Sequence, residues 1–118
     1  MNDRELLELA AKAAGEPYFE HAPEGGLYLS NGEDWNPLTE DGDAFRLAVK
    51  LSIIVATYPE EILNTVEAIA FFDGNRRKEK HITEKLGDDP YAATRRAIVR
   101  AAAEIGKSLC DASIGRVK

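Results

Sequence analysis

Carboxylates gather around the single tryptophan of this sequence, within residues 31–51. Five acids precede the first basic residue of that segment: Glu33, Asp34, Glu40, Asp41 and Asp43. Closely spaced carboxylates can hold calcium, but an EF-hand loop needs oxygen ligands at alternate positions, and Leu38 interrupts the series that Asp34 and Asn36 begin. Three of these acids, Glu40, Asp41 and Asp43, fit the first turn of a helix, where negative charge opposes the helix dipole favourably. We therefore interpret the segment as a helix start rather than a calcium site.

The same segment is the candidate for contact with a partner. Residues 1–45 hold 11 acidic and 2 basic residues, a net charge of −9, whereas residues 46–118 hold 10 acidic and 13 basic residues, a net charge of +3. Such asymmetry fits an acidic face for a basic partner, or a solvated surface that is uneven. Trp35 is expected to anchor its loop on the core. The predicted partner-binding residues are Glu33, Asp34, Trp35 and Glu40.

Other residues with catalytic chemistry lack the spacing of a catalytic motif. The two histidines, His21 and His81, have no cysteine nearby in sequence and no HExxH pattern, so no zinc site is expected. The glycines do not form a phosphate loop, because no Gly-Lys-Ser/Thr follows them. The candidate nucleophiles lie outside any Gly-x-Ser-x-Gly turn, and they are Ser30, Ser52, Ser108 and Cys110. We therefore predict no catalytic residue, no cofactor and no metal.

Basic residues gather at two places. Residues 73–78 read Asp-Gly-Asn-Arg-Arg-Lys, the expected tip of a hairpin, and three arginines follow in the last helix, Arg95, Arg96 and Arg100. Both sets have the charge to contact a phosphate. Both also fit a solvated surface, because basic residues protect sheet edges and Arg100 can pair with Glu104 one helical turn later. We favour the solvated surface.

Composition limits the class of protein. The chain has 118 residues, 44% hydrophobic and 31% charged, which is typical of one globular domain spanning 1–118. A net charge of −6 disfavours general binding to nucleic acid, because phosphate contacts need clustered bases. No apolar run approaches the roughly 20 residues of a membrane helix, and the N-terminus has no signal-peptide block. Cys110 has no partner for an internal disulfide, so a reducing cytoplasm is expected.

Capping residues and apolar periodicity predict three helices. Asn2 and Gly15 delimit the first, over residues 3–14, whose apolar positions recur at helical spacing. The second has Thr39 or Asp41 as its N-cap and runs to about residue 50. The last follows the stretch Asp-Asp-Pro at 88–90, which supplies an N-cap and a proline in the first helical position.

Strand patterns fill the segments between these helices. A hairpin is expected from residues 18–21 and 27–30 across a Pro-Glu-Gly-Gly turn. Three more strands are expected at 52–58, 66–72 and 81–86, with the Asp-Gly pair at 73–74 as a turn. The strand at 66–72 is apolar on both faces and so is expected at the centre of its sheet. The predicted order is α-β-β-α-β-β-β-α, an α+β fold with a mostly antiparallel, sandwich-like sheet packed against helices.

Three stretches carry a resemblance to a known family. They are DRELLELAAKAAG at 3–15, WNPLTEDGDAFRLAVKL at 35–51 and DPYAATRRAIVRAAAEIG at 89–106. They resemble the small phage and prophage proteins grouped as the phage alpha-beta-alpha sandwich domain, and they cover the three expected helices. The resemblance implies a phage origin, expression inside a bacterial host and a sheet sandwiched between helices. It implies no activity and no catalytic residues.

These observations favour a non-enzymatic protein that acts in the host cytoplasm by binding a host or phage protein. Two alternatives remain open. One is a phage counter-defence protein that sequesters a nucleotide signal or blocks an immune complex, with Trp35 stacking and arginines holding phosphates. The other is a small hydrolase or transferase without a recognisable motif. A deep pocket lined by Trp35 and converging arginines would favour the nucleotide alternative.

Overall fold

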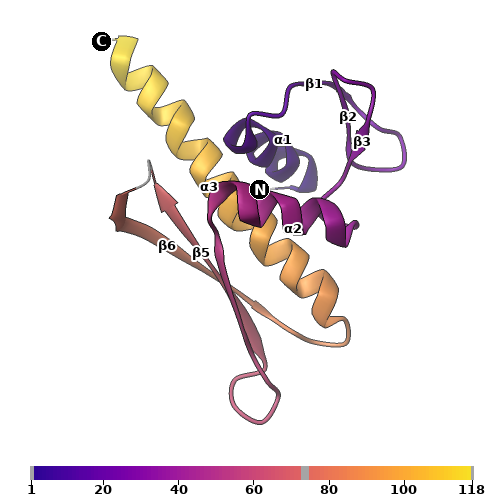
Figure 1. The fold of residues 1–118 in the computed structure, drawn as a ribbon, viewed down its shortest axis with the longest axis vertical. Helices are drawn as coiled ribbons and strands as arrows, with labels where there is room; N and C mark the ends of the chain where they lie inside the picture. The colour runs from indigo at the N-terminus through magenta and orange to yellow at the C-terminus, as the bar shows by residue number, and fades with distance from the viewer. Residues whose placement is uncertain (1, 73–74, 118) are drawn as a thin grey trace.

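Within the described residues, three helices and two three-stranded antiparallel sheets form the fold (Figure 1). The computed structural model describes residues 2–72 and 75–117, with side chains except those of Phe19, 75–77 and 111–117. The elements are α1 (Asp3–Ala14), β1 (Tyr18–His21), β2 (Leu27–Leu29), β3 (Asp34–Trp35), α2 (Asp41–Leu51), β4 (Ile54–Tyr58), β5 (Thr65–Phe72), β6 (Asn75–Lys85) and α3 (Pro90–Val117). The predicted α+β class is confirmed, and the predicted order lacks only β3.

The first and last helices begin as their capping residues predict. The Asn2 side chain accepts a hydrogen bond from the backbone N–H of Glu5 at 2.8 Å, and Gly15 ends α1 in the left-handed conformation at φ +69°. The Asp89 carboxylate accepts a hydrogen bond from the backbone N–H of Ala92 at 3.0 Å, directly before the proline that opens α3. These bonds satisfy backbone donors that a helix start leaves without an intrahelical partner.

The start of α2 differs from the prediction. Its N-cap is Glu40, whose side chain makes no capping hydrogen bond, so the predicted cap at Thr39 or Asp41 is wrong. Asp43 ties the approaching loop to the helix instead, because its Oδ2 accepts a hydrogen bond from the backbone N–H of Asn36 at 2.9 Å. Asp41 and Asp43 both lie in the first turn, as predicted.

The second sheet has the order β4-β5-β6, which confirms β5 as the central strand. Its register places Val55 opposite Ala68 and Ala68 opposite Ile82, so these three side chains share the face that packs on α3. Two predicted boundaries are wrong. β4 begins at Ile54 because α2 continues to Leu51, and β6 begins at residue 75 rather than 81. The predicted turn at 73–74 lies outside the described residues.

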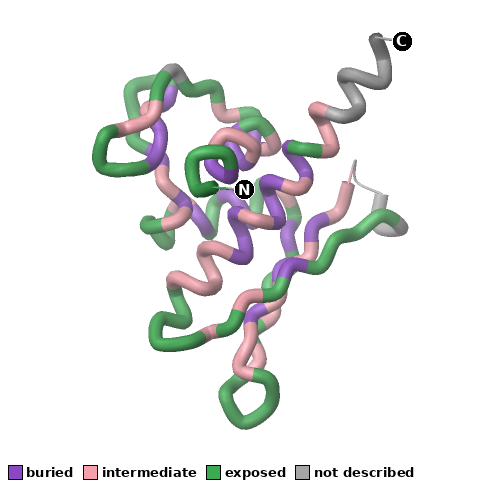
Figure 2. The backbone as a smooth tube through the Cα atoms, turned by 180° about the vertical axis from the view of Figure 1, so that it is seen from behind, coloured by how far each residue is buried: buried purple, intermediate pink, exposed green. Residues whose placement is uncertain are grey.

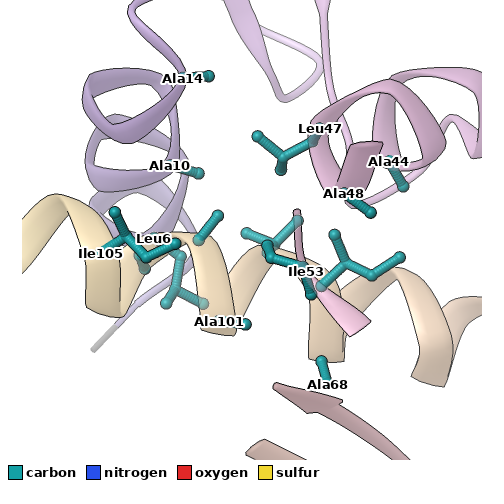
Figure 3. Packing of buried hydrophobic residues seen from close by; sticks show 14 of the residues in the cluster. Leu6, Ala10, Ala14, Ala44, Leu47, Ala48, Ile53, Ala68, Ala101 and Ile105 are labelled. Carbon is teal, nitrogen blue, oxygen red and sulfur yellow. The ribbon is translucent and has the colours of Figure 1, made fainter. Parts of the chain in front are cut away.

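The helices lie between the two sheets (Figures 1 and 2). In Figure 3, Leu6 of α1 lies beside Ile105 of α3, whereas Ala68 of β5 lies on the other side of α3. The layers are therefore the β1–β3 sheet, then α1 and α2, then α3, then the β4–β6 sheet. The resemblance implied a sheet between helices, and the structure has the opposite arrangement, with helices between sheets.

Small side chains bring α1 and α3 close together. Ala10 and Ala11 of α1 and Ala102 of α3 are completely buried. At Gly106 of α3 the approach is so close that a Cβ atom would lie 2.0 Å from the carbonyl oxygen of Leu9. This helix pair supplies much of the buried centre of the molecule, seen as purple segments in Figure 2.

Candidate functional site

The β1–β3 sheet positions the predicted partner-binding residues. Pairing of β2 with β3 sets Leu27 opposite Trp35 and Tyr28 opposite Asp34. Because side chains alternate along a strand, Leu27 and Trp35 share the inner face and Tyr28 and Asp34 share the outer face. Trp35 is only 8% exposed and Leu27 is fully buried. Trp35 therefore anchors this sheet on the core, in agreement with the anchoring interpretation, and offers little indole surface to a partner.

Carboxylates surround Tyr28 on the outer face of this sheet. The register puts Glu20 of β1 opposite Tyr28, with Asp34 of β3 opposite it on the other side. Loss of water contact raises the pKa of Tyr28, and the negative charges of Glu24, Asp34 and Glu20 raise that pKa further. A phenol in a negative field responds in this way, because its ionised form is repelled by the neighbouring carboxylates.

We call the exposed carboxylates of this region the acidic face: Glu20, Glu24, Glu33, Asp34 and Glu40. Among the described residues, none of the five forms an ion pair with a lysine, arginine or histidine. Glu33 is fixed in its turn by Asn31, whose Oδ1 accepts a hydrogen bond from the Glu33 backbone N–H at 3.0 Å and whose Nδ2 donates to Glu33 Oε2 at 3.2 Å. The face therefore keeps its negative charge largely uncompensated.

Two hollows adjoin the acidic face on either side of Asp34. One, of about 690 Å³, is lined by Glu33, Asp34 and Lys50 among others. The other, of about 480 Å³, is lined by Glu24, Asp34 and Glu40. Glu20 and Glu24 are not among the predicted partner-binding residues, although the predicted hairpin over residues 18–30 contains both.

The cations beside these hollows are neutralised by neighbouring carboxylates. Asp43 Oδ1 accepts a hydrogen bond from Arg46 at 2.7 Å, and Lys50 Nζ lies 3.3 Å from Glu16 Oε1. Both hollows therefore remain predominantly acidic, a setting that can bind the cationic side chains of a partner.

Asp41 is held by a residue far away in sequence. Its Oδ1 lies 2.6 Å from Nη1 of Arg95, whose Nε donates to the backbone carbonyl of Leu38 at 2.8 Å. This guanidinium ties the loop before α2 to the first turns of α3. Asp41 and Asp43 thus support the start of α2, as expected, and neither belongs to the acidic face.

The other two arginines of α3 also contact carboxylates. Arg96 lies 3.1 Å from Asp3 of α1, and Arg100 pairs with Glu84 of β6. The predicted pair between Arg100 and Glu104 is wrong, because Glu104 lies beside Lys80 at 3.6 Å instead. Arg100 and Glu104 both lie beside strand β6, where Glu84 and Lys80 are their ion-pair partners in place of each other. The three arginines are dispersed among separate carboxylates and do not converge on one pocket.

The two histidines lie on different sheets, each beside a glutamate. His81 Nδ1 lies 2.9 Å from Glu67 and its Nε2 lies 3.2 Å from Glu79. The hydrogen bond to Glu67, followed by that to Glu79, raises the pKa of His81. His21 Nε2 lies 3.6 Å from Glu8. Because the two carboxylates at His81 approach opposite ring nitrogens, they do not converge on one ion, and no group able to hold a metal was found among the described residues.

The candidate nucleophiles are scattered over the fold. Ser30 is exposed after β2, Ser52 follows α2 in the left-handed conformation, and Ser108 and Cys110 are partly buried in α3. Within the described part of the chain, no hydrogen bond joins any of them to a histidine or a carboxylate. Among the described side chains, carboxylates come together at the acidic face, and none of these candidate nucleophiles is placed beside a base.

Comparison of the chain with protein-family models, with characterised proteins and with solved structures found no match. The resemblance to the phage alpha-beta-alpha sandwich proteins therefore stays a prediction. Of the helices in the described residues, none is both long and apolar enough to cross a membrane.

Proposed function

We propose that this protein is a non-catalytic binding protein whose acidic face receives a basic region of a partner protein. The observation that carries the proposal is the outward row of Glu20, Tyr28 and Asp34 across three strands. Among the residues whose side chains are described, no cation pairs with either carboxylate of this row. Uncompensated charge on one face gives a potential that extends over a Debye length of ~8–10 Å at physiological salt. Such a potential speeds encounter with an oppositely charged surface.

The chemistry of the face suits a protein partner. Tyr28 provides an aromatic body with a polar tip at the centre of the carboxylates, and tyrosine is enriched at protein interfaces. The hollow lined by Glu24, Asp34 and Glu40 has room for a lysine or arginine side chain. Arginine is the favoured partner, because its planar guanidinium can bind two carboxylate oxygens at once.

The contacts weigh against the nucleotide alternative. Stacking on a base needs an exposed indole, and Trp35 is 8% exposed. Phosphate binding by Arg95, Arg96 or Arg100 would require breaking an ion pair at each arginine.

We further propose that the partner is a host or phage protein, encountered in the cytoplasm of an infected bacterium. The support is the resemblance of the three helical stretches to phage proteins, together with a single cysteine in the sequence.

The test is capture and titration with two charge-matched variants. The acidic variant carries Glu24→Gln, Asp34→Asn and Glu40→Gln. The control variant carries Glu60→Gln, Glu61→Gln and Asp88→Asn, three exposed acids away from the face that remove the same charge. A partner recovered from bacterial lysate on the immobilised wild-type protein should bind the acidic variant at least ~10-fold more weakly and the control variant with near wild-type affinity. Equal binding of all three would contradict the proposal.

A further inference from the structure

An apolar groove lies on the other side of α2 from the acidic hollows. It has a volume of about 880 Å³ and is bounded by α2, β4 and the first turns of α3. Five of its large apolar side chains are between 37% and 71% exposed: Phe45, Val49, Ile54, Val55 and Tyr91. Apolar side chains gathered in this way on a surface mark a site of association.

The groove exists because α3 covers only part of the sheet. Val55 and Thr57 of β4 lie opposite Ala68 and Val66 of β5 and so share their face. Ala68 and Val66 are fully buried, and α3 packs on β5 and β6. Val55 and Thr57 are exposed on the same face. The cover that α3 gives the sheet therefore ends before β4.

β4 is also an edge strand without protection. In the part of the chain that the structure describes, it pairs with β5 and with no strand on its other side. Its five residues, Ile-Val-Ala-Thr-Tyr, include no charge and no proline. Natural sheets commonly place lysine, proline or a bulge on such an edge, because its free N–H and C=O groups otherwise pair with another strand.

The groove is electrically neutral in a strongly acidic protein. Its charged residues are Asp41 and Arg95, which pair with each other at 2.6 Å. α2 separates the groove from the acidic side, since Phe45 and Val49 line the groove whereas Leu47 and Lys50 line one of the acidic hollows. An occupant of the groove must therefore be uncharged and apolar. It binds most favourably if it also offers a free strand edge, because its backbone can then form hydrogen bonds with β4.

We infer that the occupant is a second copy of this chain, with β4 pairing antiparallel to β4 of the other copy. The strand meets each requirement of the groove that it borders: no charge, apolar side chains and a free edge. A two-fold axis at Ala56, the middle residue, gives the longest overlap and sets Ile54 of one copy opposite Tyr58 of the other. Both copies use the same edge strand in this two-fold contact, so no free β4 edge is left to bind a third copy. It does not depend on the proposed function.

The exposed area is sufficient for such a dimer. With aromatic side chains presenting 150–250 Å² each when fully exposed, the five exposed groove residues offer on the order of 500 Å² per copy. Two copies therefore bury about 1,000 Å², the lower bound for a specific interface, before the strand backbones are counted. The net charge of −6 per copy opposes association only weakly, because the acidic face lies across α2 from the groove.

Sedimentation of the purified chain over a concentration series tests the dimer. We expect a mass of about 26 kDa, twice the 13.0 kDa of one chain. Val55→Lys and Phe45→Lys should each shift the protein to monomer, raising the dissociation constant at least 10-fold. Ile62→Lys is the matched control, because Ile62 is 66% exposed in the β4–β5 turn and lies outside the groove. Phe45 projects from the surface of α2, so its variant should keep the wild-type circular dichroism spectrum.

A cysteine at the proposed axis tests the strand pairing itself. In a Cys110→Ser background, Ala56→Cys would bring two Cα atoms to about 4.5–5.5 Å, within the range of a disulfide. We expect oxidation to give a linked dimer with Ala56→Cys and none with Ile62→Cys. A monomer at every concentration, a dimer that survives both lysine substitutions, or a dimer that Ala56→Cys does not link would overturn the inference.

Discussion

At residue 35 the sequence allows two roles, and burial decides between them. Trp35 stands among carboxylates, so a recognition role and an anchoring role fit the same sequence. In the structure its strand partner, Leu27, is fully buried and the indole itself is 8% exposed. The carboxylates next to it on β3 and α2 point outward or tie the loop down. The charge of this segment is therefore available to a partner, whereas its tryptophan holds the fold.

We expect Trp35→Ala to lower the free energy of unfolding by ~3–5 kcal/mol, the range for removing a large buried aromatic side chain. Chemical denaturation measures the loss, and Trp35→Phe should recover part of it. Unchanged stability together with lost partner binding would show that Trp35 is a recognition residue.

His81 gives the stability of the protein a pH dependence. Its hydrogen bonds to Glu67 and Glu79 favour the protonated ring, so its pKa in the folded state lies above that of the unfolded chain. The stabilisation is therefore fully present below the unfolded pKa of ~6.5 and is lost as pH rises through the folded pKa. We expect His81→Gln to lower the urea midpoint more at about pH 5.5 than at about pH 9. A difference from wild type that stays constant with pH would contradict this account.

At the scale of elements, the crossing of α1 and α3 depends on the absence of a side chain at Gly106. Alanine normally favours a helix over glycine by ~1 kcal/mol, but here its Cβ would meet the Leu9 carbonyl oxygen at 2.0 Å. We expect Gly106→Ala to cost ~1–3 kcal/mol, because the helices must move apart.

The matched control is Gly42→Ala in α2, where the nearest atom is the flexible Arg46 guanidinium at 3.2 Å. That change should be neutral or stabilising by up to ~1 kcal/mol. Thermal unfolding of both variants separates helix propensity from packing. Equal effects at the two glycines would show that the crossing tolerates a side chain.

The elements that sequence predicts well are those specified locally. Asn2, Gly15 and Asp89 act through bonds to residues within four positions, so their caps can be recognised from the sequence. β3 has only two residues, too few to show the alternating pattern of a strand, and it is recognised as a strand only by its pairing with β2. The partners of Arg95 and Arg100 depend equally on which elements meet in three dimensions.

The acidic face and the apolar groove also combine features that the sequence shows locally with features that only the three-dimensional fold determines. The excess of acids before residue 45 indicates an acidic region, but the row of Glu20, Tyr28 and Asp34 needs the strand register, which a bulge in β1 shifts. The groove had a signal in the sequence, because Phe45 and Val49 are apolar yet lie off the stripe of α2 that the core buries. Single exposed apolar residues are common on protein surfaces, so this signal becomes informative only when the fold places Phe45 and Val49 beside the apolar residues of β4 and α3.

At the scale of the whole molecule, α2 divides a charged surface from a neutral one. The acidic face lies on the β1–β3 sheet and the loops beside it, whereas β4 lines the apolar groove. If the groove joins two copies, the dimer presents two acidic faces. A partner with two basic regions would then bind far more tightly than a partner with one, provided that its regions span both faces.

If the acidic face receives a basic partner, the association rate constant of the two proteins must depend on salt concentration. Between ~20 mM and ~300 mM salt, we expect the rate constant of the wild-type protein to fall at least ~10-fold, with little change in dissociation. The variant with Glu24→Gln, Asp34→Asn and Glu40→Gln should associate slowly at low salt, and its association rate constant should change little as salt is added. The variant changed at residues 60, 61 and 88 should follow the wild type. A wild-type rate and salt dependence in the acidic variant would contradict the account.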